Sequence, residues 1–587
     1  MTEKLGSGVR GQGSGVVPGP DILLTPGPRP LTPRCLWRDL AVLLILGLLV
    51  MGAGLGMRDP WPADEPRFAL IGREMVESGR WLIPHRAGEP YPDKPPVFFW
   101  MIAAAYAVTG SVRIAFLLPS LLAGLATLAL VHDLARRLWH RRVALSAGLA
   151  LLATVQFTLQ ARTAQIDGVL ALWTTLAVYG LLRHLLLGPA WGWWYLAFAA
   201  MGLGIITKGV GFLPLFLLIP YAIVRRRGWP GVPRFPFPFW HLVLGPLVMI
   251  ATAALWVVPM LLTVAASGDP LLAAYRDNLL FKQTGQRYVA AWHHLRWVGY
   301  YIAGVAPWAW LPLTLALPWA FPAWWRRLHR REARTALLLG WVALVLLFFS
   351  LSPGKRGIYI LPAVPALVLA MAPLLPGLAR RGGVRRMALS ATIALMSLLL
   401  CVAAWLLITP APRLAPLLEQ YDAPAAAALV VPLLVLGAIG AVIAFALRRR
   451  EVIGLLTFLV AAWLVIGWWV QPLFNATRSA APFMAKVGEL IGADGELALV
   501  QWKEQLVLYA DRPVTHFGYL RQDTDREAHQ AAEWALVAPH RFVLLPRESL
   551  APCFVANRCF AVGQRNHRDW LVAPGAAIDP SCGGPAR

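Results

Sequence analysis

Residues 40–57 read LAVLLILGLLVMGAGLGM, an uncharged apolar run of 18 residues. A helix needs roughly 20 apolar residues to cross a bilayer core about 30 Å thick, so this run predicts a membrane span. It is too long for the apolar core of a typical signal peptide, and no small-residue cleavage site follows it. We therefore expect it to remain as the first span.

Similar runs recur along most of the chain and bring the expected total to about thirteen spans. The further runs lie at residues 113–133, 143–160, 168–187, 193–206, 210–224, 240–266, 297–320, 335–350, 357–373, 387–407, 425–447 and 453–471. One more run, residues 97–109, is too short to cross, and we interpret it as a helix at the outer interface.

The composition agrees with a membrane protein. Hydrophobic residues make up 58% and charged residues 14%, against roughly 45–50% and about 25% in an average soluble domain. A soluble globular enzyme is thereby excluded. The net charge of +24 lies in short basic clusters between apolar runs, which is typical of orientation signals rather than of nucleic-acid binding.

These clusters determine the predicted orientation. If residues 97–109 do not cross, every cluster falls on the same face as the amino terminus. The amino terminus is then cytoplasmic and the carboxyl-terminal tail is exported. The clusters are Arg136/Arg137/Arg141/Arg142, Arg225/Arg226/Arg227, Arg326/Arg327/Arg330/Arg331, Arg380/Arg381/Arg385/Arg386 and Arg448/Arg449/Arg450.

The expected fold class is an all-α polytopic membrane protein with a small carboxyl-terminal α/β domain. Residues 1–36, rich in Gly and Pro, predict a disordered cytoplasmic tail. Residues 37–475 form the membrane domain, whose first outer loop is 58–96, and residues 476–587 return to soluble composition.

Within this last segment, alternation at Leu497 to Gln501 and Leu506 to Ala510 predicts strands, beside a helix-like stretch from Asp525 to Trp534.

The five cysteines form no CxxC pattern, which argues against structural zinc or a redox motif. If the tail is extracytoplasmic, Cys553 and Cys559 could close a small disulfide loop. Whether they do is left open by the sequence.

Four basic residues violate the orientation trend. Lys94, Lys208, Lys355 and Arg356 are expected on the outer face beside apolar segments. A cation held there suits an anionic ligand such as a phosphate headgroup. The alternative for each is that its side chain simply reaches to water.

Two acids are expected on the same face. Asp64 precedes Phe68, Ile71 and Met75 at helical spacing, and Asp167 opens a later span. Either acid could merely cap its helix. A carboxylate next to phosphate-binding cations also suits group transfer from a lipid phosphate, with the acid accepting the nucleophile's proton and the reacting carbon inverting. Because nucleotide-activated donors are confined to the cytoplasm, the donor should be linked to a polyprenyl phosphate.

Several motifs at these positions resemble the bacterial aminoarabinose transferases and the wider protein-mannosyltransferase-like glycosyltransferases of the GT-C fold. The resemblance covers roughly residues 58 to 373. The motifs are DEPRFALIGREMVESGRWLIPHRAGEPYPDKPPVFFW (64–100), ARTAQIDGVLALW (161–173), GLGIITKGV (202–210), TGQRYVAAWHH (284–294) and FFSLSPGKRGIYILP (348–362).

The resemblance implies a role for each matching residue. Asp64 becomes the catalytic or acceptor-orienting acid, supported by Arg67, and Asp167 matches the acid that opens a later span. The residues implied to hold the donor phosphate are Lys94, Lys208, Arg287, Lys355 and Tyr359, with the adjacent Arg356. An inner-membrane location with a periplasmic carboxyl-terminal domain follows from the same resemblance.

The resemblance also implies a zinc contact. Asp93 stands where these enzymes usually have Glu, and His294, with His293 adjacent, is the matching loop histidine. Two ligands make a weak site, and both histidines could instead be interfacial polar anchors.

The sugar and the acceptor remain open: lipid A, a core or O-antigen sugar, a cell-wall glycan or a protein hydroxyl. The rival functions are a lipid-linked-sugar flippase, which needs no base, and a noncatalytic protein that only binds polyprenyl phosphates.

Overall fold

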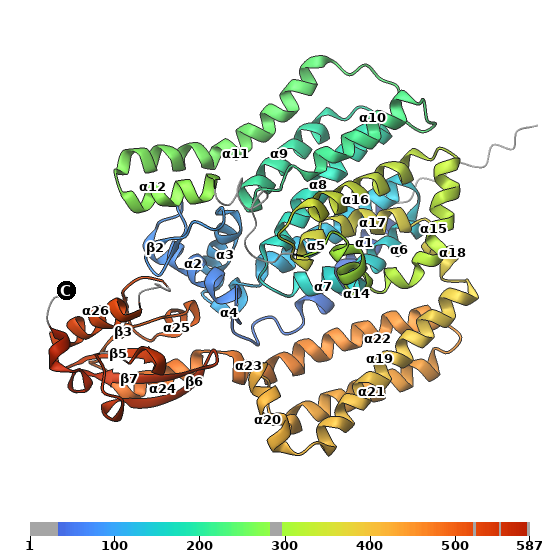
Figure 1. The fold of residues 1–587 in the computed structure, drawn as a ribbon. Helices are drawn as coiled ribbons and strands as arrows, with labels where there is room; N and C mark the ends of the chain where they lie inside the picture. The colour runs from blue at the N-terminus through green and yellow to red at the C-terminus, as the bar shows by residue number, and fades with distance from the viewer. Residues whose placement is uncertain (1–32, 282–295, 520–523, 551–552, 584–587) are drawn as a thin grey trace, which may run out of the picture.

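A computed structural model describes residues 33–281, 296–519, 524–550 and 553–583. The chain is mostly helical, and Figure 1 shows a helical body with a separate unit of strands and helices at one end. The predicted disordered tail, residues 1–36, lies almost entirely outside the described residues.

An inner bundle forms the centre of the body. Its longest helix, α8, is apolar, and its candidate membrane span is 78% buried within the molecule. The bundle consists of α1 (Pro33–Gly52), α5 (Leu118–Leu138), α6 (Arg141–Ala153), α7 (Val155–Ala161), α8 (Ile166–Leu187), α9 (Trp191–Lys208), η1 (Leu213–Leu217), α10 (Leu218–Arg226), α16 (Ala333–Leu351), η4 (Gly357–Ile360) and α17 (Ala363–Met371). The connecting elements η3 (Tyr300–Val305), α14 (Ala306–Ala309), α15 (Leu313–His329) and α18 (Leu375–Leu378) pack beside it.

A peripheral layer of apolar helices is far less buried. The spans of α11 and α19 are each only 17% buried within the molecule, so most of their apolar surface is available to lipid. The peripheral elements are α11 (Phe239–Ser267), α12 (Pro270–Asp277), α19 (Gly382–Ile408), α20 (Ala411–Gln420), α21 (Ala426–Ala446), α22 (Glu451–Val465), η5 (Ile466–Val470) and α23 (Gln471–Arg478). In Figure 1, α19, α21 and α22 lie together as one layer below the inner bundle.

The peripheral layer approaches the backbone of the inner bundle closely at η5. Gly54, just after α1, has φ +80°, and a Cβ there would lie 2.2 Å from the carbonyl oxygen of Gly467 in η5. A Cβ on Gly467 would lie 2.5 Å from the carbonyl oxygen of Ala53. The two backbones can approach this closely because both residues are glycines, which have no Cβ.

The described residues contain seven helices long and apolar enough to cross a membrane, or nine if each of two bent helix pairs is one span. The bent pairs are α6 with α7 and the η3–α14 segment with α15. The other four of the expected runs fall on α1, α9, η1 with α10, and η4 with α17. The short run at residues 97–109 forms α3 (Val97–Thr109), a 13-residue apolar helix.

The first loop folds against α3. Pro66 at the first turn and Gly79 at the left-handed carboxyl-terminal cap set the ends of α2 (Glu65–Ser78). Its apolar face, including Phe68 and Met75, is buried against Phe98 and Phe99 of α3. A two-stranded hairpin of β1 (His85–Arg86) and β2 (Glu89–Pro90) and the short α4 (Val112–Ala115) complete this region.

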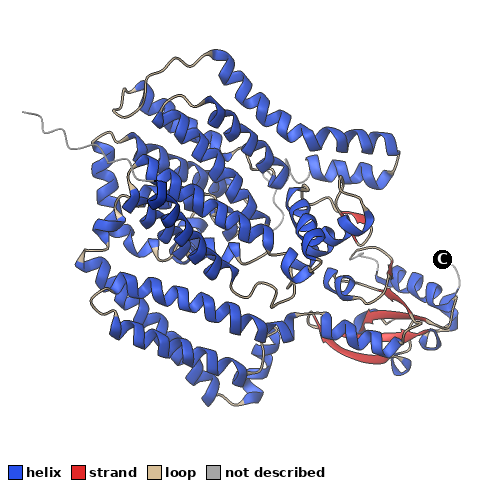
Figure 2. Cartoon of the chain, turned by 180° about the vertical axis from the view of Figure 1, so that it is seen from behind, coloured by secondary structure: helices blue, strands red, loops and turns tan. Residues whose placement is uncertain are grey.

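The carboxyl-terminal unit contains the only sheet of more than two strands in the described chain. Figure 2 shows its strands gathered at one end of the molecule. The strand order is β4-β3-β5-β7-β6, with β3 parallel to β4 and β5, and with β7 antiparallel to β5 and β6. Its main elements are α24 (Ala481–Ile491), β3 (Glu496–Leu499), α25 (Glu504–Tyr509), β4 (Val514–His516), α26 (Thr524–Leu536), β5 (Arg541–Pro546), β6 (Phe560–Arg565) and β7 (Arg568–Pro574). Short 3-10 turns lie at η6 (Arg547–Ser549), η7 (Ala556–Arg558), η8 (Gly575–Ala577) and η9 (Pro580–Gly583).

One sequence prediction about this unit was wrong, and one question that the sequence left open is answered. Residues 506–510 lie mostly in α25, a helix instead of a strand, because a short apolar run buried on all sides carries no reliable period. Cys553 pairs with Cys582, and Cys559 is a free cysteine. The possible Cys553–Cys559 loop does not form, because the fold brings η9, the last of the described turns, to Cys553.

Candidate active site

Asp64 occupies the N-cap position of α2 but does not cap the helix. Its backbone is already helical (φ −95°, ψ −33°), and its side chain makes no capping hydrogen bond. Its carboxylate oxygens lie 3.6 Å from Nη1 of Arg67 and 3.9 Å from Nη2 of Arg356. The capping explanation for Asp64 is therefore wrong. Its carboxylate faces the guanidinium of Arg67, three residues along the chain, and that of Arg356, from a distant part of the sequence.

A second charged pair joins three elements of the inner bundle. Asp167, in the first turn of α8, forms an ion pair with Lys208 at the end of α9. The Lys208 ammonium lies 4.5 Å from the ring centroid of Tyr359 in η4, within range of a cation–π contact. The sequence predicted that all three residues belong to one site, and the structure places them together.

The turn of residues 356–359, which runs into η4, links the carboxylate of Asp64 to the Asp167–Lys208 pair. The backbone N–H of Tyr359 donates to the carbonyl of Arg356 at 3.0 Å, so the residue that faces Asp64 and the residue that contacts Lys208 share one turn. Gln156 of α7 donates through Nε2 to the carbonyl of Gly357 at 2.9 Å, and its Oε1 accepts from Nε1 of Trp310 at 3.0 Å. Gln156 thus fixes the turn to α7, and Trp310 holds Gln156 in place.

Lys355 has a structural role in this turn. Its ammonium donates to the carbonyls of Ser352 at 2.6 Å and Arg296 at 2.9 Å, and the residue is 4% exposed. An ammonium has three N–H donors, so these two bonds occupy only part of its capacity.

Lys94 lies between the hairpin and α3, and its ammonium donates to the carbonyl of Asp93 at 2.9 Å. Burial raises the pKa of the neighbouring Tyr91, with Asp93 adding to the shift and Arg67 opposing it. The Tyr91 phenol therefore stays protonated beside these charges. Two further predicted site residues, Arg287 and His294, lie outside the described residues, as does His293.

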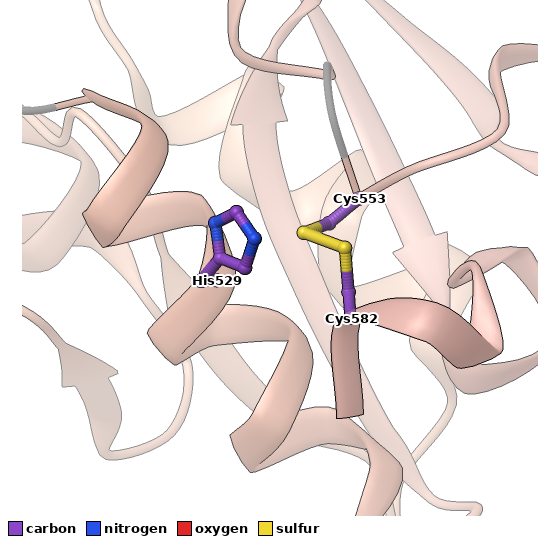
Figure 3. Close-up of side chains that lie close together, drawn as sticks. All are labelled: His529, Cys553 and Cys582. Atoms are coloured by element: carbon purple, nitrogen blue, oxygen red, sulfur yellow. A yellow bond between two sulfur atoms is a disulfide. The ribbon is translucent and has the colours of Figure 1, made fainter. Parts of the chain in front are cut away.

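The predicted metal pair is therefore only half described. Asp93 supplies one carboxylate, which is too few ligands for zinc. Within the described part of the chain, one group of three metal-ligand residues is found, His529 with Cys553 and Cys582. Figure 3 shows that the two sulfurs of this group are joined as a disulfide, so they offer no thiolate ligands. The described residues do not fit a zinc site.

The sequence interpretation missed two acids that hold the site together. Glu65, next to Asp64, is buried and receives both Nη groups of Arg58 at 2.5 and 2.8 Å, together with the backbone N–H groups of Trp61 and Ala164 at 3.0 Å each. Glu504 of α25 accepts from Nε of Arg67 at 2.5 Å. Glu65 was visible in the DEPR motif as a second acid, but Glu504 lies in the polar tail, where no motif identifies it.

Comparison with known proteins agrees with this architecture. The dolichyl-phosphate-mannose-protein mannosyltransferase family matches residues 93–256. The undecaprenyl phosphate-alpha-4-amino-4-deoxy-L-arabinose arabinosyl transferase 1 of Pseudomonas fluorescens Pf0-1 is 32% identical over 351 residues, which is 57% of this chain and 56% of that protein. The corresponding transferase of Aeromonas salmonicida A449 is 30% identical over 393 residues, 64% of this chain and 67% of that protein.

A solved structure shows the same fold over nearly the whole chain. The crystal structure of ArnT from Cupriavidus metallidurans bound to undecaprenyl phosphate has a TM-score of 0.71 and 23% identity, and the match covers 95% of this chain and 100% of that one. The apo structure of the same protein gives a TM-score of 0.67.

Fold and site together define a polytopic membrane-type protein of the GT-C architecture. The chain belongs to the family of the undecaprenyl phosphate-alpha-4-amino-4-deoxy-L-arabinose arabinosyl transferases. It spans 56%, 61% and 62% of the length of three of the relatives that it matches. The family resemblance seen in the sequence motifs is confirmed.

Proposed function

We propose that this protein is a glycosyltransferase that moves a sugar from an undecaprenyl-phosphate donor to an acceptor on the outer face of the inner membrane. The observation that carries the proposal is the arrangement of Asp64. Its carboxylate lies at the start of α2 without capping that helix, 3.9 Å from Nη2 of Arg356. Arg356 shares a turn with Tyr359, whose ring contacts the Lys208 ammonium. An accessible carboxylate beside cations is what transfer from a lipid phosphate requires.

The reaction follows from these charges. Asp64 accepts the proton of the acceptor's hydroxyl while its oxygen attacks the anomeric carbon of the donor. The bond from that carbon to the phosphate oxygen breaks, and undecaprenyl phosphate leaves with the electron pair. Because attack and departure are in line, the anomeric configuration inverts. Arg67 orients Asp64, from which it lies 3.6 Å away.

The departing phosphate is stabilised by cations and needs no acid catalyst. Lys208 pairs with Asp167, and Arg356 lies 3.9 Å from Asp64. Pairing with Asp167 holds the Lys208 ammonium at the end of α9, and Lys355 retains donor capacity beyond its two carbonyl contacts. The proposed phosphate-binding set is Lys94, Lys208, Arg287, Lys355, Arg356 and Tyr359.

Family membership suggests the donor. The relatives carry 4-amino-4-deoxy-L-arabinose and undecaprenyl phosphate in their names, so this lipid-linked aminosugar is the first donor to test. The acceptor is lipid A or another lipopolysaccharide, envelope glycan or protein hydroxyl. The carboxyl-terminal third shows no motif that selects among these.

The site implies a topology. We place about thirteen spans in the membrane, with α1, α9, η1–α10 and η4–α17 counted beside the nine that qualify by length and composition. The amino terminus is then cytoplasmic, and residues 476–587 are periplasmic. The boundary of the membrane domain at residue 475 falls within α23. Zinc bound by Asp93 and His294 stays outside this proposal, since only one of the two is described.

Purified protein in nanodiscs, supplied with undecaprenyl phosphate-4-amino-4-deoxy-L-arabinose and lipid A, tests the proposal. The expected result is released undecaprenyl phosphate and a lipid A mass raised by one aminosugar, both absent in Asp64→Asn. If the first donor is inert, mass spectrometry of envelope lipids and glycans from deletion and wild-type cells identifies the transferred unit. Lipid scrambling without release would instead indicate a flippase, and neither activity would indicate a binding protein.

A further inference from the structure

The carboxyl-terminal unit docks directly on the first loop. Arg73 of α2 donates to the carbonyl of Leu508 in α25 at 2.8 Å. His516 of β4 donates through Nε2 to the carbonyl of Ala87 in the hairpin at 2.6 Å. Helix α2, which Asp64 precedes, is therefore held by the carboxyl-terminal unit as well as by the membrane domain.

Glu504 is the charged centre of this contact. Its side chain is 5% exposed, and its Oε1 lies 2.5 Å from Nε of Arg67 and 3.5 Å from Nη1 of Arg86. Arg86 in turn lies flat against Tyr519, with its guanidinium carbon 3.4 Å from the ring centroid. A buried carboxylate between two guanidinium groups is fixed in place, because moving it would leave buried charges unpaired.

Arg67 is shared between two acids. Its Nε contacts Glu504 while its Nη1 faces Asp64 at 3.6 Å. Burial would lower the pKa of Arg67, but the charge of Glu504 raises it above the usual range, so the guanidinium stays charged. The short bond to Glu504 holds Arg67 away from a close ion pair with Asp64.

We infer that Glu504 is a positioning residue for Asp64: it binds Arg67 and balances its charge, which keeps the Asp64 carboxylate accessible to the acceptor's proton. The inference rests on the proposed function and deepens it, because it makes the carboxyl-terminal unit part of the active site. Without the negative charge of Glu504, Arg67 and Arg86 add to Arg356 and stabilise the Asp64 carboxylate against protonation, so Asp64 becomes a weaker base.

Other titratable or charged groups also face Glu504, Arg67 and Arg86, and they keep their identity in the Glu504 and Arg86 variants. They are Asp64, Tyr91 and Asp93 of the first loop, Arg356 before η4, and Lys503, Tyr519 and Arg568 of the carboxyl-terminal unit.

The main test is Glu504→Gln, which keeps an acceptor for Arg67 but removes the charge. We expect kcat to fall about tenfold with KM for the donor nearly constant, and the acid limb of the pH profile to move down by about half a pH unit or more. Glu504→Asp should restore most of the rate. Arg86→Gln removes a positive charge from the same cluster and should move the acid limb in the opposite direction.

Glu527→Gln is the matched control for damage to the domain. Glu527 is also a fully buried acid of the carboxyl-terminal unit, but it bonds to Gln501 at 2.9 and 2.6 Å, within the same unit. Equal losses in the Glu504 and Glu527 variants, with unmoved pH profiles, would overturn the inference.

A second measurement does not depend on transfer. Carbodiimides modify protonated carboxyl groups, so the pH midpoint for modification of Asp64, read by peptide mass spectrometry, should fall in Glu504→Gln and rise in Arg86→Gln. Unchanged midpoints would overturn the inference even if transfer occurs. If the wild-type protein is inactive but the midpoints shift in the two variants, the proposed function is contradicted, whereas the effect of Glu504 on the Asp64 carboxylate is supported.

Discussion

An acid lies at the start of α2 and another at the start of α8, but the two acids are held differently. Asp167 is 6% exposed and closely paired with Lys208, whereas Asp64 is 21% exposed and its nearest cations lie at 3.6 and 3.9 Å. Glu65, beside Asp64, resembles Asp167, since Arg58 and two backbone N–H groups saturate it. An acid whose lone pairs are saturated fixes structure, and an acid with loose partners is available to accept a proton.

The comparison is tested most strongly at Asp64. Asp64→Asn should lower transfer about a thousandfold, because the general base is lost while the shape of the site is kept. The measurement is release of undecaprenyl phosphate from the donor in nanodiscs. Thermal unfolding should be close to that of the wild type, since the Asp64 ion pairs are long. Retention of more than about a tenth of the activity would mean that another group accepts the proton.

Glu65→Gln tests the other side of the comparison. It leaves Arg58 charged and buried without an ionic partner, so the free energy of unfolding should fall by about 3–5 kcal/mol. Thermal unfolding in detergent, monitored by thiol reactivity, measures the loss. Asp64→Asn is the matched control one residue away, and equal destabilisation of the two variants would contradict the distinction between them.

Lys208→Met should destabilise less, by about 2 kcal/mol, because Lys208 is partly exposed and water can partly solvate the Asp167 charge left behind. The double variant Asp167→Asn with Lys208→Met should recover most of that stability but not transfer. A double variant as unstable as the single one would show that the pair is not what stabilises α8 against α9.

Glu74, farther along α2, gives the smallest effect. Burial raises the pKa of Glu74 to about 6, opposed by the backbone N–H groups of Gly88 and Ala87. Since the folded pKa is the higher one, the ionised form is disfavoured in the folded state, and stability should fall as pH rises from about 4.5 to 6, by about 1–2 kcal/mol.

Unfolding of wild type and Glu74→Gln across this pH range measures the effect. The difference in stability, wild type minus variant, should be greatest at about pH 4.5 and shrink toward neutral pH. A difference that is constant with pH would show that Glu74 is not desolvated.

Part of the candidate site was predictable because basic residues expected on the disfavoured side of a membrane stand out in a sequence. Lys208 and Arg356 were found in this way, and Asp64 and Asp167 were found as acids expected on the same side; the structure brings the four residues near one another. Glu504 was not, because acids are ordinary in a soluble tail and its partner Arg67 is over four hundred residues away. The sequence also could not predict that Glu65, and not Asp64, is fully hydrogen-bonded. The two acids are neighbours in sequence, and only the fold decides which backbone N–H and guanidinium groups reach each carboxylate.

The helical runs were likewise easier to find than their breaks. The apolar stretches predicted where helices lie, but the 69° bend between α6 and α7 depends on tertiary contacts, such as the Val155 N–H bond to the Leu311 carbonyl. In the same way, periodicity could not separate the helix α25 from a strand.

The glycine contact between Gly54 and Gly467 has a practical consequence for anyone who labels or tags this protein. A side chain at either position would push η5 off α1, and η5 continues into α23, whose Asn475 accepts the backbone N–H of Asp59 at 2.8 Å. A probe placed there would disturb the first loop through Asn475 and Asp59. The outward faces of α19 and α21, with exposed residues such as Leu407 and Val442, are safer attachment points for fluorophores or spin labels.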